Sequence, residues 1–212
     1  MRDRLILLPG WGLGVSPLEP LAEALRALDE HLRVEIEPLP VLLSADLEDW
    51  LDELDSTLPD DVWLGGWSLG GMLASELAAR RGDRCCGLVT LASNPSFVSR
   101  EDWPSAMPAS TFEPFLNGFR DAPNTTLKRF CLLCSKGSIE PRALAGLLLG
   151  GAPKAQPDTL LAALKCLASW TPVQRCRRLA GRNCICLPGR MSWCRCRQRP
   201  MCWLYYPMSK WV

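Results

Sequence analysis

The sequence is poor in histidine, and its last quarter contains no acidic residue. His31 is the only histidine among the 212 residues. All 23 acidic residues lie at or before Asp158, whereas the 54 residues from Thr159 to Val212 include 10 basic residues and no acidic one. A globular segment of that length ordinarily carries roughly six Asp or Glu. The chain therefore divides into a conventional first part and a tail of unusual composition.

Long apolar runs are also absent. The run at residues 5–8 is too short for the apolar region of a signal peptide, and Pro9 and Gly10 interrupt it. No stretch reaches the roughly 20 apolar residues that a membrane-spanning helix requires. These absences lead us to expect a cytoplasmic protein with no membrane partner. The length indicates one domain, or one domain with an insertion.

Apolar strand patterns alternate with helical patterns in the first 98 residues. The strand patterns lie at residues 4–8 and 32–37, in a short apolar run from residue 62 that reaches Gly66, and at residues 86–91. Helical spacing of apolar residues separates them, and Ser44 is a suitable N-cap for the helix that we expect to end near residue 54. This alternation predicts an α/β fold with a mostly parallel sheet and helices on both faces.

The pattern changes between residues 99 and 166. Seven prolines divide this stretch into short helical pieces, such as residues 125–134 and 141–149. Because the stretch directly follows a sheet strand, we interpret it as a helical lid inserted over an active site, with a separate small helical domain as the alternative. The expected division is a core at residues 1–98, a lid at 99–166 and a tail at 167–212.

A glycine-rich turn joins one expected strand to the helix that follows it. The turn reads Gly66-Trp67-Ser68-Leu69-Gly70, and a strand, Gly-x-Ser-x-Gly and a helix in succession are typical of a nucleophile elbow. A serine on so sharp a turn has a strained backbone, and the helix N-terminus after it favours the negative charge that develops in acyl transfer. The alternative is a glycine-rich turn with an incidental serine.

Four stretches together resemble the α/β-hydrolases, and within them the pimeloyl-[acyl-carrier protein] methyl ester esterases of biotin synthesis. The stretches are residues 7–13 (LLPGWGL), 66–71 (GWSLGG), 91–97 (LASNPSF) followed by 102–104 (DWP), and 128–134 (KRFCLLC). The first resembles the family's oxyanion loop, the second its elbow, the third its entry into the lid and the fourth a lid helix that faces the substrate. The likeness covers roughly residues 5 to 167.

The resemblance implies a serine carboxylesterase that needs no cofactor and acts as a monomer. Ser68 would attack the ester carbonyl, and the backbone N–H groups of Trp11 and Leu69 would hold the oxyanion. The residues implied to line the substrate slot are Trp11, Phe130, Cys131, Leu132, Leu133 and Cys134. Arg129 and Arg142 stand where the family attracts its acidic carrier protein, although ordinary solvated helix charge explains them equally well.

The sequence departs from the family in the groups that should activate the serine. A serine hydrolase of this fold uses a carboxylate and then a histidine, both after the nucleophile. Here no acidic residue follows Asp158, and His31 comes before a strand, so we expect it at the sheet edge opposite Ser68. We therefore expect the family's ester hydrolysis to be impaired in this chain, and a non-catalytic binding protein on the same scaffold is the alternative.

Three interpretations of the tail compete. Cys184 and Cys186, Cys194 and Cys196, and Cys202 could hold a metal, but zinc sites usually have wider Cys-x2–4-Cys spacing. Basic residues interleaved with aromatics could form a nucleic-acid-binding arm. A shifted reading frame in a G+C-rich gene would produce Arg, Cys, Trp, Pro and Gly, and it accounts for the missing acids and the missing histidine together. We favour the third, and so expect no metal, no nucleic-acid partner and no C-terminal strands of the fold.

Overall fold

The computed structural model describes residues 3–101, 103–104, 106–153, 156–170, 184–187 and 194–195. Within them the strands form a single six-stranded sheet in the order β2-β1-β3-β4-β5-β6. The strands are β1 (Arg4–Leu8), β2 (Arg33–Ile36), β3 (Val62–Trp67), β4 (Cys85–Leu91), β5 (Cys184–Leu187) and β6 (Cys194–Arg195). Neighbours pair in parallel from β2 to β5, and only β6 pairs antiparallel. The predicted mostly parallel sheet is confirmed.

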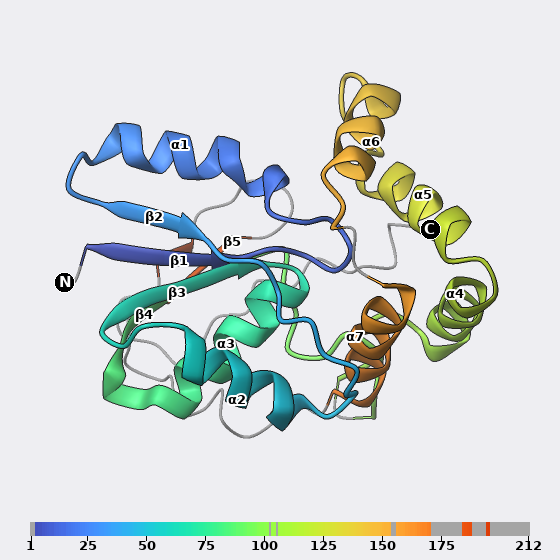
Figure 1. The fold of residues 1–212 in the computed structure, drawn as a ribbon, viewed down its shortest axis with the longest axis horizontal. Helices are drawn as coiled ribbons and strands as arrows, with labels where there is room; N and C mark the ends of the chain where they lie inside the picture. The colour runs from blue at the N-terminus through green and yellow to red at the C-terminus, as the bar shows by residue number, and fades with distance from the viewer. Residues whose placement is uncertain are drawn as a thin grey trace.

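Helices cover both faces of this sheet (Figure 1). One face carries α1 (Glu19–Leu28), preceded by the short 3-10 helix η1 (Ser16–Leu18). The other carries α2 (Leu47–Thr57) and α3 (Leu69–Arg81), and the 3-10 helix η2 (Gly82–Arg84) leads into β4.

Strand β1 shows why the sheet needs cover on both faces. Its side chains alternate between the two apolar clusters: Leu5 and Leu7 pack with Leu18 and Val34 on the α1 side, while Ile6 packs in the opposite cluster, which includes α2 and α3. A strand buried on both faces reads as a continuous apolar run, and that is how residues 5–8 read in the sequence.

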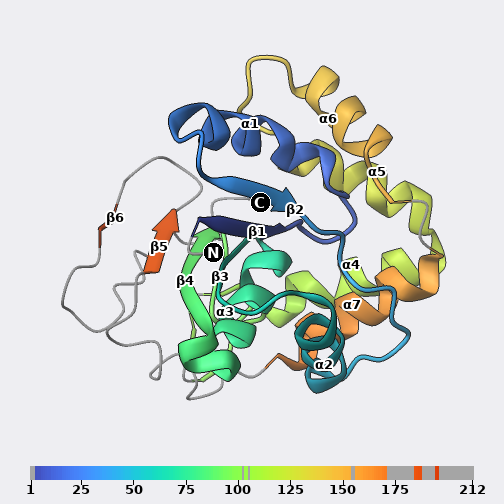
Figure 2. The ribbon, with the colours of Figure 1, turned by 60° about the vertical axis from the view of Figure 1, so that its left-hand side comes forward.

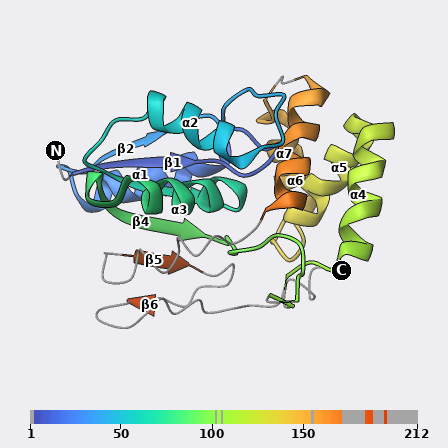
Figure 3. The same cartoon turned by 90° about the horizontal axis from the view of Figure 1, so that it is seen from below.

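Four further helices lie beyond the carboxyl ends of the parallel strands (Figure 3). They are α4 (Ala109–Asp121), α5 (Pro123–Cys134), α6 (Pro141–Gly150) and α7 (Pro157–Ser169). Phe112 and Phe119 of α4 and Leu164 of α7 belong to the same apolar cluster as Ile6 and Leu73 of the sheet layer. The lid segment therefore shares one core with the sheet.

The cap of α2 differs from the expectation. Asp46, and not Ser44, is the N-cap: its Oδ1 accepts the backbone N–H of Glu48 at 3.0 Å, and the helix begins at Leu47. Ser44 Oγ instead accepts the backbone N–H of Asp46 at 3.0 Å. Both residue types can cap a helix. Asp46 does so because its backbone is extended directly before the first helical residue.

The far edge of the sheet also corrects the expectation that C-terminal strands are missing. Strand β5 pairs in parallel with β4, and β6 pairs with β5 (Figure 2). The open edge of β4 presents backbone N–H and C=O groups that need partners, and the backbone of Cys184–Leu187 supplies them.

Most of the tail lies outside the described residues, and so do several residues on which its three interpretations depend, including Cys196 and Cys202. In the part of the chain that the structure describes, no three His, Cys, Asp or Glu residues are grouped so that they could hold a metal ion. In the same part, no helix has the length and apolar character needed to cross a membrane.

A buried arginine ties the end of α3 to the turn that leads into the central strand. The side chain of Arg81 is completely buried, and its Nε donates to Asp55 Oδ1 at 2.6 Å. Its two terminal nitrogens donate to the carbonyl oxygens of Pro59 and Leu58, each at 2.7 Å. Burial alone would raise the pKa of Asp55, but the hydrogen bond and charge of Arg81, together with Arg84, hold it below the ordinary value.

Replacing this arginine should destabilise the protein strongly. Arg81→Met keeps the apolar stem but leaves the Asp55 carboxylate and the carbonyls of the turn without their buried donor, so we expect the free energy of unfolding to fall by about 3 kcal/mol. Arg84→Met is the matched control, because Arg84 is half-exposed and should cost less than about 1 kcal/mol. Urea unfolding followed by tryptophan fluorescence measures both changes.

The same ion pair sets a dependence on acid. A carboxyl whose folded pKa is depressed contributes stability above its unfolded pKa and loses it as the pH falls through the folded value. The contribution of Asp55 should therefore be present above its ordinary pKa of 3.8 and be lost only as the pH falls further, through the depressed pKa of the folded state. Equal acid sensitivity in Arg81→Met and the unaltered chain would contradict this role for Arg81.

Candidate active site

Ser68 occupies the turn between β3 and α3, at the carboxyl end of a central strand. Its backbone has φ 54° and ψ −118°, a conformation that L-residues rarely adopt. A non-glycine residue in such a region costs about 1–3 kcal/mol, which persists only where the surroundings enforce it. The expected placement of the serine on a strained strand-to-helix turn is confirmed.

A close backbone contact enforces the turn. A Cβ atom on Gly70 would lie 2.2 Å from the carbonyl oxygen of Leu8 at the end of β1. No side chain fits at that distance. The first turn of α3 and the end of β1 meet here through main-chain atoms, so neither backbone can move without its whole element. Glycine at position 70 therefore lets the first turn of α3 pack directly on β1, with Ser68 at the top of the sheet.

The loop after β1 lies beside the serine. A Cβ on Gly10 would stand 3.6 Å from the Cβ of Ser68, which is ordinary van der Waals contact. Trp11 is the next residue of this loop, and Leu69 is the first residue of α3. The structure thus brings the three residues expected to form the nucleophile and oxyanion site into one region. The direction of the Trp11 and Leu69 N–H groups toward the oxyanion remains a prediction.

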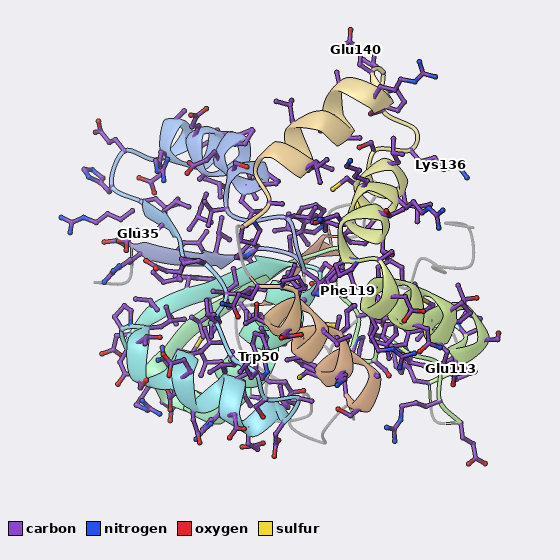
Figure 4. All side chains as sticks on the ribbon, turned by 45° about the vertical axis from the view of Figure 1, so that its right-hand side comes forward. Glu35, Trp50, Glu113, Phe119, Lys136 and Glu140 are labelled. Atoms are coloured by element: carbon purple, nitrogen blue, oxygen red, sulfur yellow. The ribbon has the colours of Figure 1, made fainter. Side chains whose placement is uncertain are left out.

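The Trp11 side chain connects this loop to the lid. Its ring meets Phe115, Phe119 and Phe130 edge-on, with centroid distances of 5.6, 5.1 and 5.1 Å. Its Nε1 donates to the carbonyl oxygen of Leu160 in α7 at 2.8 Å. Phe119 points inward from α4 toward the sheet layer (Figure 4). One tryptophan therefore contacts α4, α5 and α7.

The six residues expected to line the substrate slot divide into two groups. Phe130 packs on Trp11, and Cys131 and Cys134 pack with Leu13 on the inward face of α5. The outward group consists of Leu132 and Leu133, whose exposed fractions are 50% and 46%. The structure therefore does not bring Leu132 and Leu133 together with Trp11, because consecutive helical residues lie about 100° apart and cannot all share one face.

The two cysteines of this helix, Cys131 and Cys134, pack inward, and burial disfavours the thiolate form of both. Burial raises the pKa of the Cys131 thiol, and burial raises that of Cys134 to about 12, with a smaller contribution from Cys131. A thiol with so high a pKa stays protonated at neutral pH, and the thiolate is the reactive form.

His31 lies far from this site, as expected. It stands between α1 and β2, and β2 begins beside the first residues of β1, at the opposite edge from Ser68. Its side chain is 83% exposed, and its nearest charged partner is Glu30, with Nε2 and Oε1 3.9 Å apart. It cannot reach the serine without a change of fold.

Comparison with known proteins agrees with this architecture. The family described as "alpha/beta hydrolase fold" matches residues 39–123. The pimeloyl-[acyl-carrier protein] methyl ester esterase of Aromatoleum aromaticum is 36% identical over 180 residues, which cover 79% of this chain and 71% of that relative. The chain belongs to the α/β-hydrolase family.

Other members of the family are similar over shorter shares of their length. The biotin biosynthesis bifunctional protein BioHC of Cellvibrio japonicus is 35% identical, and the match covers 79% of this chain but 34% of that protein. The pimeloyl-[acyl-carrier protein] methyl ester esterase of Shewanella woodyi is 35% identical over 64% of this chain and 54% of its own. The chain therefore spans only about half the length, or less, of several curated relatives.

Solved structures show the same fold at low identity. An esterase (EaEST) from Exiguobacterium antarcticum superposes with a TM-score of 0.70 at 17% identity, covering 87% of this chain and 72% of that one. The enol-lactonase from Burkholderia xenovorans gives a TM-score of 0.68 at 16% identity, covering 89% and 73%. These likenesses show the fold alone, and they agree with the family assignment.

Sequence reasoning missed the aromatic partners of Trp11 that lie on α4. Phe112, Phe115 and Phe119 recur at helical spacing, which is a readable signal for an inward face. That signal indicates burial alone. It does not say that Phe115 and Phe119 meet the oxyanion loop.

The contact at Gly70 can be tested with a pair of alanine variants. Gly70→Ala should lower the free energy of unfolding by at least about 2 kcal/mol, because the added Cβ would clash with the backbone at the end of β1. Gly146→Ala in α6 is the control: no atom lies within 4 Å of the added Cβ, and alanine favours helix by up to about 1 kcal/mol. Urea unfolding measures the stability of both variants. A Gly70→Ala variant as stable as the unaltered chain, with an unchanged circular dichroism spectrum, would contradict the close packing.

Proposed function

We propose that this protein is a serine carboxylesterase directed to the methyl ester of a pimeloyl group on acyl-carrier protein, in an impaired form. One observation carries the proposal: Ser68 is held in a strained turn at the carboxyl end of β3, beside the loop that carries Trp11. The names of the relatives at 35–36% identity supply the substrate class.

In this proposal the chemistry is acyl transfer to water. The Ser68 hydroxyl oxygen attacks the ester carbonyl while its proton passes to a base, and the N–H groups of Trp11 and Leu69 stabilise the oxyanion. Methanol leaves with a proton, and water then releases the free carboxylate from the acyl-serine. Phe130 and the inward face of α5, which bears Cys131 and Cys134, would contact the acyl chain.

The impairment follows from the residues that could accept the serine proton. An alcohol is almost wholly protonated at neutral pH and needs an adjacent base. The only imidazole in the chain belongs to His31, at the wrong edge of the sheet, and no carboxylate follows Asp158 in the sequence. Solvent hydroxide is then the base. Loss of triad members typically removes on the order of 10⁴ to 10⁶ in turnover, and oxyanion and binding terms leave roughly 10³ over water.

The remote position of His31 also favours a second candidate, a binding protein that uses the hydrolase scaffold without catalysis. Such a protein would retain the apolar surroundings of Trp11 and Phe130 and hold an acyl chain there. The two candidates differ in turnover, because only the esterase releases alcohol from a bound ester at a rate that depends on Ser68.

Supplying the family's C-terminal segment should restore turnover. We would compare the chain with a chimera in which residues 168–212 are replaced by the corresponding segment of the Aromatoleum aromaticum relative, using a short p-nitrophenyl ester. The chimera should hydrolyse it at least about a thousandfold faster, because it regains a base and an acid for Ser68.

Two variants control this experiment. Ser68→Ala should abolish the gain in the chimera, whereas His31→Ala should change neither protein, since its side chain is exposed and remote. Ordinary esterase rates in the unaltered chain would contradict the impairment. A folded chimera as slow as the unaltered chain would favour the binding protein.

The carrier protein would dock on α5 and α6. Residues 123–150 contain four basic side chains, Lys128, Arg129, Lys136 and Arg142, and a single acidic one, Glu140. Lys136 and Glu140 project from the turn between the two helices (Figure 4). Arg129 and Arg142 are exposed, so their charge is available to an acidic partner.

Charge reversal tests this surface without any need for turnover. Arg129→Glu combined with Arg142→Glu should weaken binding of acyl-carrier protein by about tenfold or more at low salt, because like charges then face each other. Arg33→Glu is the control, since Arg33 is exposed at the start of β2, at the amino end of the parallel strands and away from α5 and α6 (Figure 3). Fluorescence anisotropy of labelled carrier protein measures affinity, and an equal loss in all variants would contradict a specific surface.

A further inference from the structure

The backbone N–H and C=O groups of Ser68 both form hydrogen bonds with the end of β4 or the residues just after it. Its N–H donates to the carbonyl oxygen of Leu91, the last residue of β4, at 2.9 Å. Its own carbonyl oxygen accepts the Met72 N–H at 3.0 Å, which starts α3. The same carbonyl oxygen also accepts the hydroxyl of Ser93 at 2.9 Å. Strand pairing explains the first bond and helix geometry the second, but neither explains the third.

A second strained residue aims the Ser93 hydroxyl at this carbonyl. Ala92 has a φ of 47°, in the left-handed region that alanine rarely occupies. The chain bends at this residue directly after β4, and the next residue, Ser93, lies within hydrogen-bond distance of the elbow. Of the described residues, only Asp61, Ser68 and Ala92 are non-glycines with positive φ. Ser93 follows Ala92 in the chain, and its hydroxyl donates to the carbonyl oxygen of Ser68.

A glycine in α3 leaves the space that this hydroxyl fills. A Cβ on Gly71 would lie 2.0 Å from Ser93 Oγ and 2.6 Å from the carbonyl oxygen of Gly66. An alanine at position 71 would displace the Ser93 hydroxyl. The hydroxyl is therefore enclosed between the start of α3 and the end of β4, and it can also donate to the Leu91 carbonyl at 3.2 Å.

From this arrangement we infer that Ser93 is a positioning residue for the nucleophile. The inference rests on the proposed role of Ser68. By bonding to the carbonyl of Ser68, Ser93 opposes relaxation of the strained φ and ψ, and so keeps the serine hydroxyl aimed above the carboxyl end of β3. Ser93 itself does not touch the substrate. Its role is to reduce the fraction of molecules in which the elbow has relaxed into an unstrained turn.

Amide hydrogen exchange of the intact chain tests this role without turnover. Ser93→Ala should speed exchange of the Ser68 and Met72 amides by about tenfold, because opening of the elbow then breaks one hydrogen bond fewer. Ser96→Ala is a matched control: its hydroxyl donates to the Val98 carbonyl at 2.7 Å, in the same segment but away from the elbow. This control should leave the two elbow amides unchanged.

The rate of covalent labelling then measures the reactivity of the Ser68 hydroxyl directly. In a p-nitrophenyl alkylphosphonate, Ser68 Oγ would form a bond to phosphorus, the bond to the aryl oxygen would break, p-nitrophenolate would leave, and the serine proton would pass to hydroxide. Intact mass at mildly alkaline pH follows the reaction. Ser93→Ala should lower the maximal labelling rate by about tenfold and leave the half-saturating concentration unchanged, whereas Ser96→Ala should change neither.

Each outcome separates the two proposals. Absence of Ser68 labelling in the unaltered chain would count against the proposed function, while faster elbow exchange in Ser93→Ala would still support positioning. Equal exchange in Ser93→Ala and Ser96→Ala would overturn the positioning role. Global unfolding of Ser93→Ala alone, seen as loss of the far-ultraviolet circular dichroism, would also overturn it in favour of a general structural role.

Discussion

The close contact between the end of β1 and the first turn of α3 is the constraint on which the rest of the site depends. Gly70 packs against the Leu8 carbonyl, so the chain must leave β3 and enter α3 within one residue, and Ser68 takes the strained conformation that this requires. The cost of about 1–3 kcal/mol is offset by burial of the helix that follows, including Leu69 and Leu73, which are nearly inaccessible.

The lid depends on a second interaction, centred on Trp11. This residue follows Gly10 in the loop beside Ser68, while its ring and its indole N–H contact three lid helices. A movement of α5 or α7 would therefore shift the Trp11 side chain, and with it the loop proposed to hold the oxyanion. Phe130 on the inward face of α5 packs on Trp11, whereas Leu132 and Leu133 turn outward and remain half-exposed.

The nucleophile turn and the groups that would activate it come from different parts of the chain. Every contact that enforces the elbow involves residues up to Ser93, whereas this fold takes its acid and its base from segments after the nucleophile. A change confined to the tail can therefore remove the base without disturbing the geometry of Ser68. The structure agrees with this separation, because the elbow is complete while His31 lies at the opposite edge of the sheet.

The sequence by itself determined the local elements, the parallel sheet, the elbow at Ser68 and the remote position of His31. Each depends on periodicity or chain order, which neighbouring residues set. It led to Ser44 as the cap of α2, where the structure has Asp46, and it did not predict that β5 would join the open edge of β4. The contacts of Trp11 with Phe119 and of Ser93 with Ser68 likewise emerged only from the tertiary structure. The physical reason is that such contacts join residues far apart in the chain, whose meeting depends on how whole elements pack.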